Sequence, residues 1–157
     1  MINNECRICI RQLDQHDVGD VQSFLELGLA YLAEIDDTPE EVNKIFLRSI
    51  VSKDFENDRW LLLLLKGDLH LGFVHAKIDI QERPGWGYIL EFYIVPKMRR
   101  KGYGSMLHSK IVDIFVQKEL KNVWLTANPK SESFWRSVGF SYSGEEENGY
   151  KVMCCEV

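Results

Sequence analysis

The sequence is short of the features that mark disordered, fibrous and membrane proteins. Only 4 prolines and 11 glycines occur in 157 residues, and 45% of the residues are hydrophobic, so we expect one globular domain over residues 1–157. The run of leucines from Leu61 to Leu65 is far too short to cross a bilayer. The N-terminus shows no basic segment followed by an apolar one, so we expect a soluble, cytoplasmic protein without a membrane partner.

Cysteine is scarce as well, and its placement argues against a metal site. The chain has 4 cysteines, Cys6, Cys9, Cys154 and Cys155, which on number alone could form a zinc ligand set. Both pairs lie in runs typical of strands, without the Gly or Pro turn that lets two thiolates converge on one ion. Adjacent strand residues point to opposite faces. We therefore expect free buried thiols and no metal.

Positive charge is not in excess. The chain has 19 Lys and Arg against 24 Asp and Glu, which argues against nucleic acid as a partner. The imbalance is uneven, because residues 1–58 hold 13 acidic and 5 basic side chains whereas residues 59–157 hold 11 and 14. The first part therefore favours a cation and the second an anion.

Hydrophobic periodicity predicts a mixed α/β fold. The run 86–95 is apolar on both faces, which is typical of a central strand covered on both sides. Hairpin-linked strands precede strand–helix–strand units, so we expect a mixed sheet with helices on both faces. The predicted strands are 5–11, 60–66, 69–80, 86–95, 122–126 and a pair within 140–157, and the predicted helices are 14–35, 38–53 (with Thr38 as its N-cap), 102–120 and 131–138.

The segment between the central strand and the third predicted helix has the composition of an anion-binding loop. Two glycines allow backbone N–H groups to approach a phosphate closely, and a helix N-terminus adds partial positive charge. It differs from the dinucleotide-binding glycine pattern, because position 107 is Leu, and it lacks the Gly-Lys-Ser/Thr ending of a nucleotide-hydrolysing loop. Its basic side chains are Lys97, Arg99, Arg100 and Lys101, and its glycines are Gly102 and Gly104.

Two spaced motifs resemble those of the GNAT superfamily of N-acetyltransferases. Arg99-x-x-Gly102-x-Gly104 resembles the family's acyl-CoA pyrophosphate loop, Arg/Gln-x-x-Gly-x-Gly/Ala, and Phe92-x-Ile94-Val95-Pro96 resembles the strand that leads into it. Downstream, a strand ending at Asn128 is followed by a short helix ending Trp135-x-x-x-Gly139-Phe140, as in the family. The order of elements is similar over essentially the whole chain.

The resemblance implies a mostly antiparallel sheet of about seven strands, with a splay between the fourth and fifth strands that receives acetyl-CoA. Backbone groups of residues 92–95 would pair with the pantetheine arm, amides of residues 100–105 would hold the pyrophosphate, and an N–H near Ile94 would stabilise the oxyanion. By resemblance the acetyl-CoA-binding residues are Phe92, Ile94, Val95, Arg99, Arg100, Lys101, Gly102, Tyr103, Gly104, Ser105, Asn128, Ser133 and Trp135.

Acetyl transfer to an amine needs a base for the ammonium proton and can use an acid for the leaving thiolate. Glu91, the carboxylate of the central strand, and Tyr88, which aligns with a catalytic position in some relatives, are the two candidate bases. They are three residues apart, so a regular strand would place them on opposite faces unless a bulge intervenes. The usual acid of the family, a Tyr, falls at Trp135, which leaves Ser131, Ser133 and Tyr142 as candidates. We expect His75 and His108 to be structural.

Acceptor specificity in this superfamily comes largely from the first two helices and the loop between them. Here that region is acidic, which favours a cationic amine, a polyamine or a basic peptide end, or is ordinary solvated helix surface. Its residues are Tyr31, Glu34, Asp36, Asp37, Glu40 and Glu41.

The sequence predicts a GNAT-type acetyltransferase that moves acetyl from acetyl-CoA to a primary amine of a small molecule or peptide. A non-catalytic acyl-CoA-binding module is the alternative, because Trp135 replaces the usual Tyr, and a phosphate-ligand-binding protein unrelated to CoA is a third hypothesis. Exposed C-terminal strands and the family's habit suggest a homodimer.

Overall fold

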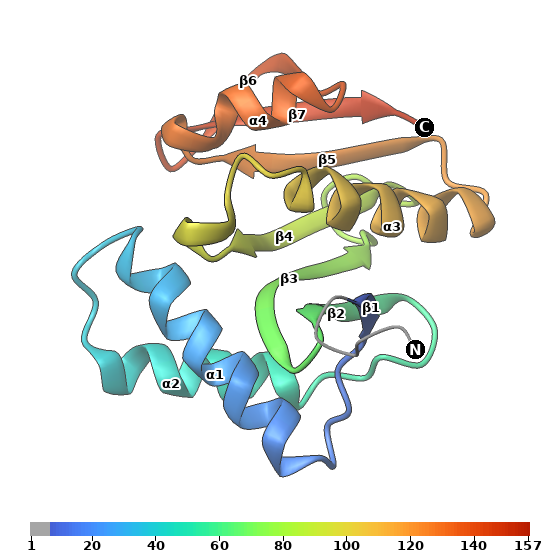
Figure 1. Ribbon diagram of the computed structural model, residues 1–157. Helices are drawn as coiled ribbons and strands as arrows, with labels where there is room; N and C mark the ends of the chain where they lie inside the picture. The colour runs from blue at the N-terminus through green and yellow to red at the C-terminus, as the bar shows by residue number, and fades with distance from the viewer. Residues whose placement is uncertain (1–6) are drawn as a thin grey trace.

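A single mixed sheet organises the protein. The computed structural model describes residues 7–157, and in it the strands are ordered β1-β2-β3-β4-β5-β7-β6 (Figure 1). Neighbouring strands are antiparallel except β4 and β5, which are parallel. The strands are β1 (Ile8–Gln12), β2 (Arg59–Lys66), β3 (Leu69–Ile78), β4 (Gly87–Ile94), β5 (Asn122–Ala127), β6 (Ser141–Glu147) and β7 (Tyr150–Glu156). The predicted mixed, mostly antiparallel seven-stranded sheet is confirmed.

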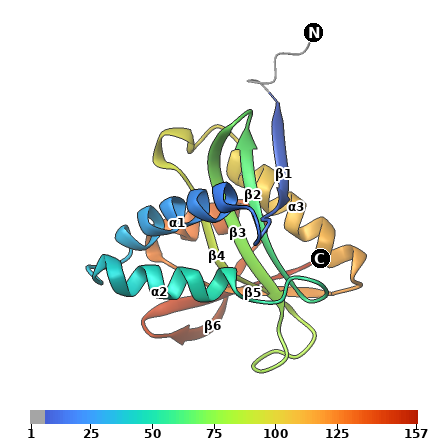
Figure 2. The ribbon, with the colours of Figure 1, turned by 90° about the horizontal axis from the view of Figure 1, so that it is seen from below.

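Helices cover both faces of this sheet, as the sequence predicted. Figure 2 shows α1 and α2 lying together on one side of the strands. The helices are α1 (Val18–Ala33), α2 (Glu40–Val51), α3 (Tyr103–Gln117) and α4 (Glu132–Ser137), with 3-10 turns η2 (Pro96–Met98) and η3 (Pro129–Ser131).

Strand alternation divides the core into two layers. Leu61 and Leu63 of β2 pack with Phe24 of α1 and Leu47 of α2, whereas Leu62 and Leu64 belong to the core on the side of α3 and α4. The leucine run is therefore buried on both faces, which is the position of an inner strand rather than of a membrane segment. Among residues 7–157, no helix combines the length and the hydrophobicity that crossing a membrane requires.

Two local predictions are corrected. Helix α2 starts at Glu40 with Pro39 as its N-cap and without a side-chain cap, because the Thr38 hydroxyl is bound to the Asp36 carboxylate, which also accepts from the Thr38 backbone N–H at 2.9 Å. The thiols are free but less buried than expected, since Cys9 is exposed and Cys154 and Cys155 are half-buried; Cys6 lies outside the described residues. Cys9 is exposed because β1 is an edge strand. Within residues 7–157, no three potential metal ligands lie close together.

An ion pair between β1 and α1 gives a testable contribution to stability. The buried Asp20 carboxylate accepts two hydrogen bonds from Arg11, at 2.6 and 2.7 Å, and one from the backbone N–H of Asp14 at 2.9 Å. Asp20→Asn is expected to lower the free energy of unfolding by about 2 kcal/mol at pH 7, because it leaves the Arg11 charge without its partner. Urea unfolding measures the difference.

The same pair predicts a pH dependence. The hydrogen bond from Arg11 lowers the pKa of Asp20 in the folded state. The contribution of Asp20 is therefore complete above the ordinary carboxyl range, at about pH 4, and is lost as the pH falls through the lower folded value. The wild type and Asp20→Asn should converge in stability as the pH falls from 6 to 2, and a difference that stays constant would contradict this assignment.

Candidate active site

The sheet opens between its two parallel strands. Only the first residues of β4 pair with β5, at Gly87–Val123 and Tyr88–Trp124, and the strands then diverge (Figure 1). The N–H of Val95 donates to Leu71 on the β3 side at 2.8 Å. Because backbone groups alternate along a strand, those of Phe92 and Ile94 point toward the splay. The predicted splay between the fourth and fifth strands is confirmed.

The glycine-containing loop lies at the open end of this splay. After η2 the backbone has φ values of +61° at Arg100 and +89° at Gly102, and α3 begins at Tyr103 without a side-chain cap. The first N–H groups of α3, including those of Gly104 and Ser105, are therefore left without a side-chain acceptor. Arg100 and Lys101 are exposed beside them. This combination of free amides, helix dipole and basic side chains suits an anion.

Arg99 connects this loop to α1. Its Nε donates to the Ile94 carbonyl at 2.8 Å, its terminal nitrogen donates to both Glu34 oxygens at 2.8 and 3.0 Å, and its guanidinium lies 5.4 Å from the Tyr93 ring centre. The loop, the end of β4 and the end of α1 are therefore held together. Arg99 and Glu34, predicted for acetyl-CoA and for the acceptor respectively, are partners of each other in the structure.

The downstream motif lies on the far side of the splay. Trp135 is 5% exposed and packs against Phe92, with ring centres 5.0 Å apart, so its side chain belongs to the core. The side-chain oxygen of Asn128 accepts from the Lys130 N–H at 3.0 Å, and Ser133 is exposed. A Cβ atom on Gly104 would come within 3.0 Å of the Phe134 ring, so any larger residue where α3 meets α4 would require Phe134 to shift.

A β-bulge places the two candidate bases on one face. His75 of β3 lies opposite Glu91 of β4, and the next residue, Ala76, lies opposite Ile89, so Leu90 is an extra residue in β4. With this insertion the side chains of Tyr88 and Glu91 both face α1 and α2. A bulge is the feature expected to bring these two side chains onto one face, and the β3–β4 register contains one.

Glu91 is held by a buried hydrogen-bonded chain. Its Oε2 lies 2.5 Å from Nδ1 of His75, and Nε2 of His75 lies 2.8 Å from a terminal nitrogen of Arg59. The Glu91 side chain is 12% exposed and that of His75 only 2%. No hydrogen bond from residues 7–157 reaches the other carboxylate oxygen, Oε1.

Two tyrosines, Tyr31 of α1 and Tyr88 of β4, are close enough to Glu91 to be affected by its charge. Burial raises the pKa of Tyr31 on α1, and the charge of Glu91 raises it further. Tyr150 of β7 has a smaller effect in the same direction. Burial and Glu91 likewise raise the pKa of Tyr88, to about 12. Tyr88 stacks on Trp124 at 3.9 Å, which fixes its ring. A phenol with this pKa keeps its proton near neutral pH, so it can donate a hydrogen bond but is a poor base.

Most of the predicted acidic acceptor region is already paired. Glu40 and Glu41 both contact Lys44, at 3.1 and 3.3 Å, and Asp36 accepts from the Thr38 N–H. The Lys44 and Arg99 contacts reduce the net negative charge that this region presents to a substrate, whereas the hydrogen bond from Thr38 leaves the Asp36 carboxylate charged.

The hydrogen-bonded series from Arg59 through His75 to Glu91 was not predicted from the sequence. His75 was expected to be structural, and neither Arg59 nor Tyr150 was among the predicted site residues. Strand alternation does place His75 on the same face as Phe73 and Lys77. Its partner on β4, however, depends on the bulge, and no turn residue in the sequence indicates that bulge.

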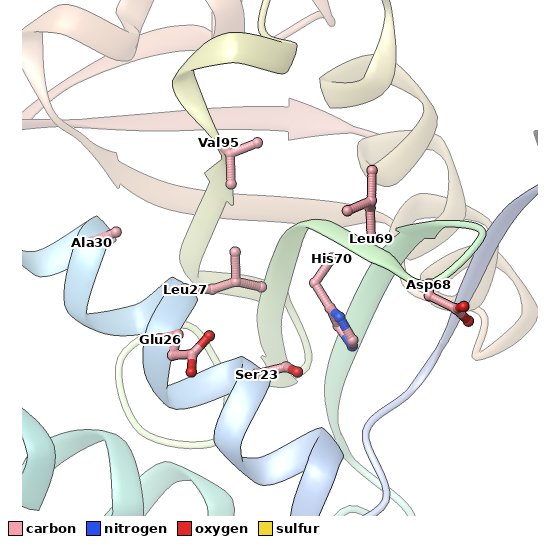
Figure 3. A pocket seen from close by; sticks show the side chains of 8 residues that line it. All are labelled: Ser23, Glu26, Leu27, Ala30, Asp68, Leu69, His70 and Val95. Atoms are coloured by element: carbon pink, nitrogen blue, oxygen red, sulfur yellow. The ribbon is translucent and has the colours of Figure 1, made fainter. Parts of the chain in front are cut away.

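A separate hollow of about 420 Å³ lies between α1, the β2–β3 turn and the end of β4 (Figure 3). Val95 is its only lining residue among the predicted site residues. Glu91 and the loop glycines do not border it, so it lies beside the splay rather than in it. Its lining residues are Ser23, Glu26, Leu27, Ala30, Asp68, Leu69, His70 and Val95.

The same architecture occurs in solved acetyltransferase structures. PaiA N-acetyltransferase from Thermoplasma acidophilum, determined with coenzyme A, is 19% identical, with a TM-score of 0.76 and coverage of 96% of this chain and 99% of that chain. A spermidine N-acetyltransferase chimera of Vibrio cholerae SpeG and hSSAT is 19% identical, with a TM-score of 0.72 and 95% coverage of each chain. The ribosomal-protein-S18-alanine N-acetyltransferase of Escherichia coli is 13% identical, with a TM-score of 0.70 and coverage of 96% of this chain and 94% of that chain.

Sequence comparison agrees with this structural likeness. A search of curated protein sequences gave no significant match. The family model for the Acetyltransferase (GNAT) family, however, matches residues 29–140, from the end of α1 through the splay and the glycine loop to the end of the Trp135 motif. With most of its length matched and the fold shared, this chain belongs to the GNAT acetyltransferase family.

Proposed function

We propose that this protein transfers the acetyl group of acetyl-CoA to a primary amine. The observation that carries the proposal is the meeting of three features at the β4–β5 splay: strand-edge backbone groups at Phe92 and Ile94, an uncapped helix N-terminus behind Gly102, and the Glu91 carboxylate. The first would pair with pantetheine, the second would hold the pyrophosphate, and the third would receive the amine proton.

The reaction we propose is a direct attack. Glu91 takes a proton from the substrate ammonium, directly or through water, and the neutral amine nitrogen then forms a bond to the thioester carbonyl carbon. The backbone N–H of Ile94 is aimed toward the splay, where it would stabilise the oxyanion. Collapse breaks the carbon–sulfur bond, the nitrogen gives up its second proton as the amide forms, and the departing thiolate takes up that proton to leave as CoA thiol; the proton on Glu91 is then released to solvent. Tyr88, as a neutral phenol, serves as a hydrogen-bond donor.

The acceptor we propose is cationic. Glu91 lies at the face toward α1, and the charges of Glu147, Glu82 and Asp79 all act on Tyr88, so the surroundings of the cleft are negative. Burial and the neighbouring carboxyl of Glu82 raise the pKa of Glu147, as expected where two carboxyl groups compete for one proton. A substrate ammonium near them would relieve this repulsion.

A non-catalytic acyl-CoA-binding module is the second candidate, and Trp135 is the observation that favours it. This side chain is packed in the core and carries no hydroxyl group, so it cannot protonate a leaving thiolate.

Release of free CoA thiol from acetyl-CoA, measured across polyamines, aminoglycosides, amino acids and short peptides, separates the two functions. Turnover with a cationic amine supports the enzyme. Acetyl-CoA binding without turnover across the panel would favour the binding module, and absence of both would refute each. Inorganic phosphate and simple nucleotides, tested for thermal protection, serve as controls for generic anion binding.

A further inference from the structure

We propose that Arg59 and His75 are positioning residues that orient the Glu91 carboxylate toward the amine. The inference rests on the proposed function, because orientation matters only if Glu91 receives a proton. It arises from a hydrogen-bonded chain that crosses three adjacent strands, from Arg59 on β2 through His75 on β3 to Glu91 on β4.

Arg59 selects the tautomer of His75. A guanidinium has only donors, so the His75 Nε2 that lies 2.8 Å from it must be the acceptor. The ring proton is then on Nδ1, which donates to Glu91 Oε2 at 2.5 Å. A neutral histidine can carry its proton on either nitrogen, and the contact with Arg59 leaves only the form that supports Glu91.

The tautomer in turn orients the carboxylate. With Oε2 bound to a ring that is 2% exposed and cannot turn freely, the carboxylate plane is fixed and Oε1 is left for a substrate. Positioning of this kind keeps a base aligned with the proton it must take.

Ionisable groups on the neighbouring helix and strands determine the electrostatic surroundings of the His75–Glu91 pair. Helix α1 contributes the phenol of Tyr31 and β4 that of Tyr88, whereas β2 and β3 contribute the cations of Arg59 and Lys77. Burial lowers the pKa of Arg59, while the charge of Glu91 raises it.

The tautomer can be observed without any activity. Long-range proton–nitrogen NMR of the full chain labelled with ¹⁵N-histidine is expected to show His75 protonated at Nδ1 and unprotonated at Nε2. In Arg59→Met, where Nε2 has lost its donor, the single tautomer should give way to a mixture or to the imidazolium, and Arg59→Lys, which retains a donor, should preserve it. A wild-type proton on Nε2 overturns the inference.

The catalytic consequence is tested with paired variants at His75. His75→Leu is expected to lower kcat by about 10-fold with little change in the KM for acetyl-CoA, and to move the acidic limb of the pH–rate profile to higher pH, because a half-buried carboxylate that loses a donor holds its proton more tightly. His75→Asn keeps a donor at the position of Nδ1 and should restore most of the rate and the original limb. Thermal unfolding establishes that both variants are folded.

The outcomes separate this inference from the proposed function. Equal rates and profiles for His75→Leu and the wild type would refute positioning while leaving the acetyltransferase intact, and so would an Asn variant as impaired as the Leu variant while both remain folded. Failure of the wild type to acetylate any amine would refute the proposed function, and with it the catalytic role of the pair, even if the NMR spectra show the expected tautomer.

Discussion

Replacing Glu91 by Gln is expected to lower kcat for amine acetylation by about 100-fold, the effect typical of losing a general base. Gln keeps the shape of the side chain and an oxygen that can accept from His75 Nδ1, so the architecture of the site should survive. The remaining rate should rise steeply with pH between pH 6 and 9, because it depends on amine that is already neutral in solution and that fraction grows as the pH approaches the pKa of the amine. Steady-state kinetics between pH 6 and 9 measure both effects.

Tyr88→Phe is the matched control for this substitution. It removes a phenol from the same face of β4 while the ring can still stack on Trp124. Because burial and Glu91 raise the pKa of Tyr88 to about 12, we expect Phe to retain a substantial fraction of the wild-type rate and its pH dependence. If Tyr88→Phe abolishes turnover and Glu91→Gln does not, the assignment of the base is wrong and passes to Tyr88.

Replacing Gly102 by Val is expected to weaken CoA binding by at least about 10-fold. Gly102 has φ +89°, a backbone conformation that β-branched residues strongly disfavour, although a Cβ there would meet no atom within 4 Å. Relief of the strain would move the N–H groups at the start of α3, which we propose hold the pyrophosphate. Isothermal titration with CoA measures the affinity.

Gly85→Val provides the comparison, because Gly85 has φ +84° and equally open surroundings but lies in the β3–β4 connection. Both variants should lose a similar amount of stability, about 1–2 kcal/mol, but only Gly102→Val should lose affinity. An unchanged CoA affinity in Gly102→Val would remove the loop assignment. Equal losses of affinity in both variants would show that strain, rather than the loop, is responsible.

Much of the fold could be predicted because its signals are local. Apolar patterning on both faces of 86–95 marked the central strand, and the Gly102-x-Gly104 spacing with its basic neighbours marked the loop that does lie between β4 and α3. Such signals can be recognised in a single sequence, because they depend on strand and helix periodicity and on backbone conformations that glycine adopts readily. Thr38 is not the helix cap, because its hydroxyl is bound to the nearby Asp36 carboxylate instead of accepting from the first turn of α2.

The sequence by itself determined the order of elements, the position of the glycine-containing loop that we propose binds the pyrophosphate, and the choice of the two candidate bases. Only the tertiary structure decided that Tyr88 and Glu91 share a face and that Arg99 binds Glu34. It also decided that Arg59 is hydrogen-bonded to His75 and His75 to Glu91. The physical reason is register. A single extra residue in β4 reverses which side chains face the cleft, and pairing between strands depends on contacts between distant segments rather than on local pattern.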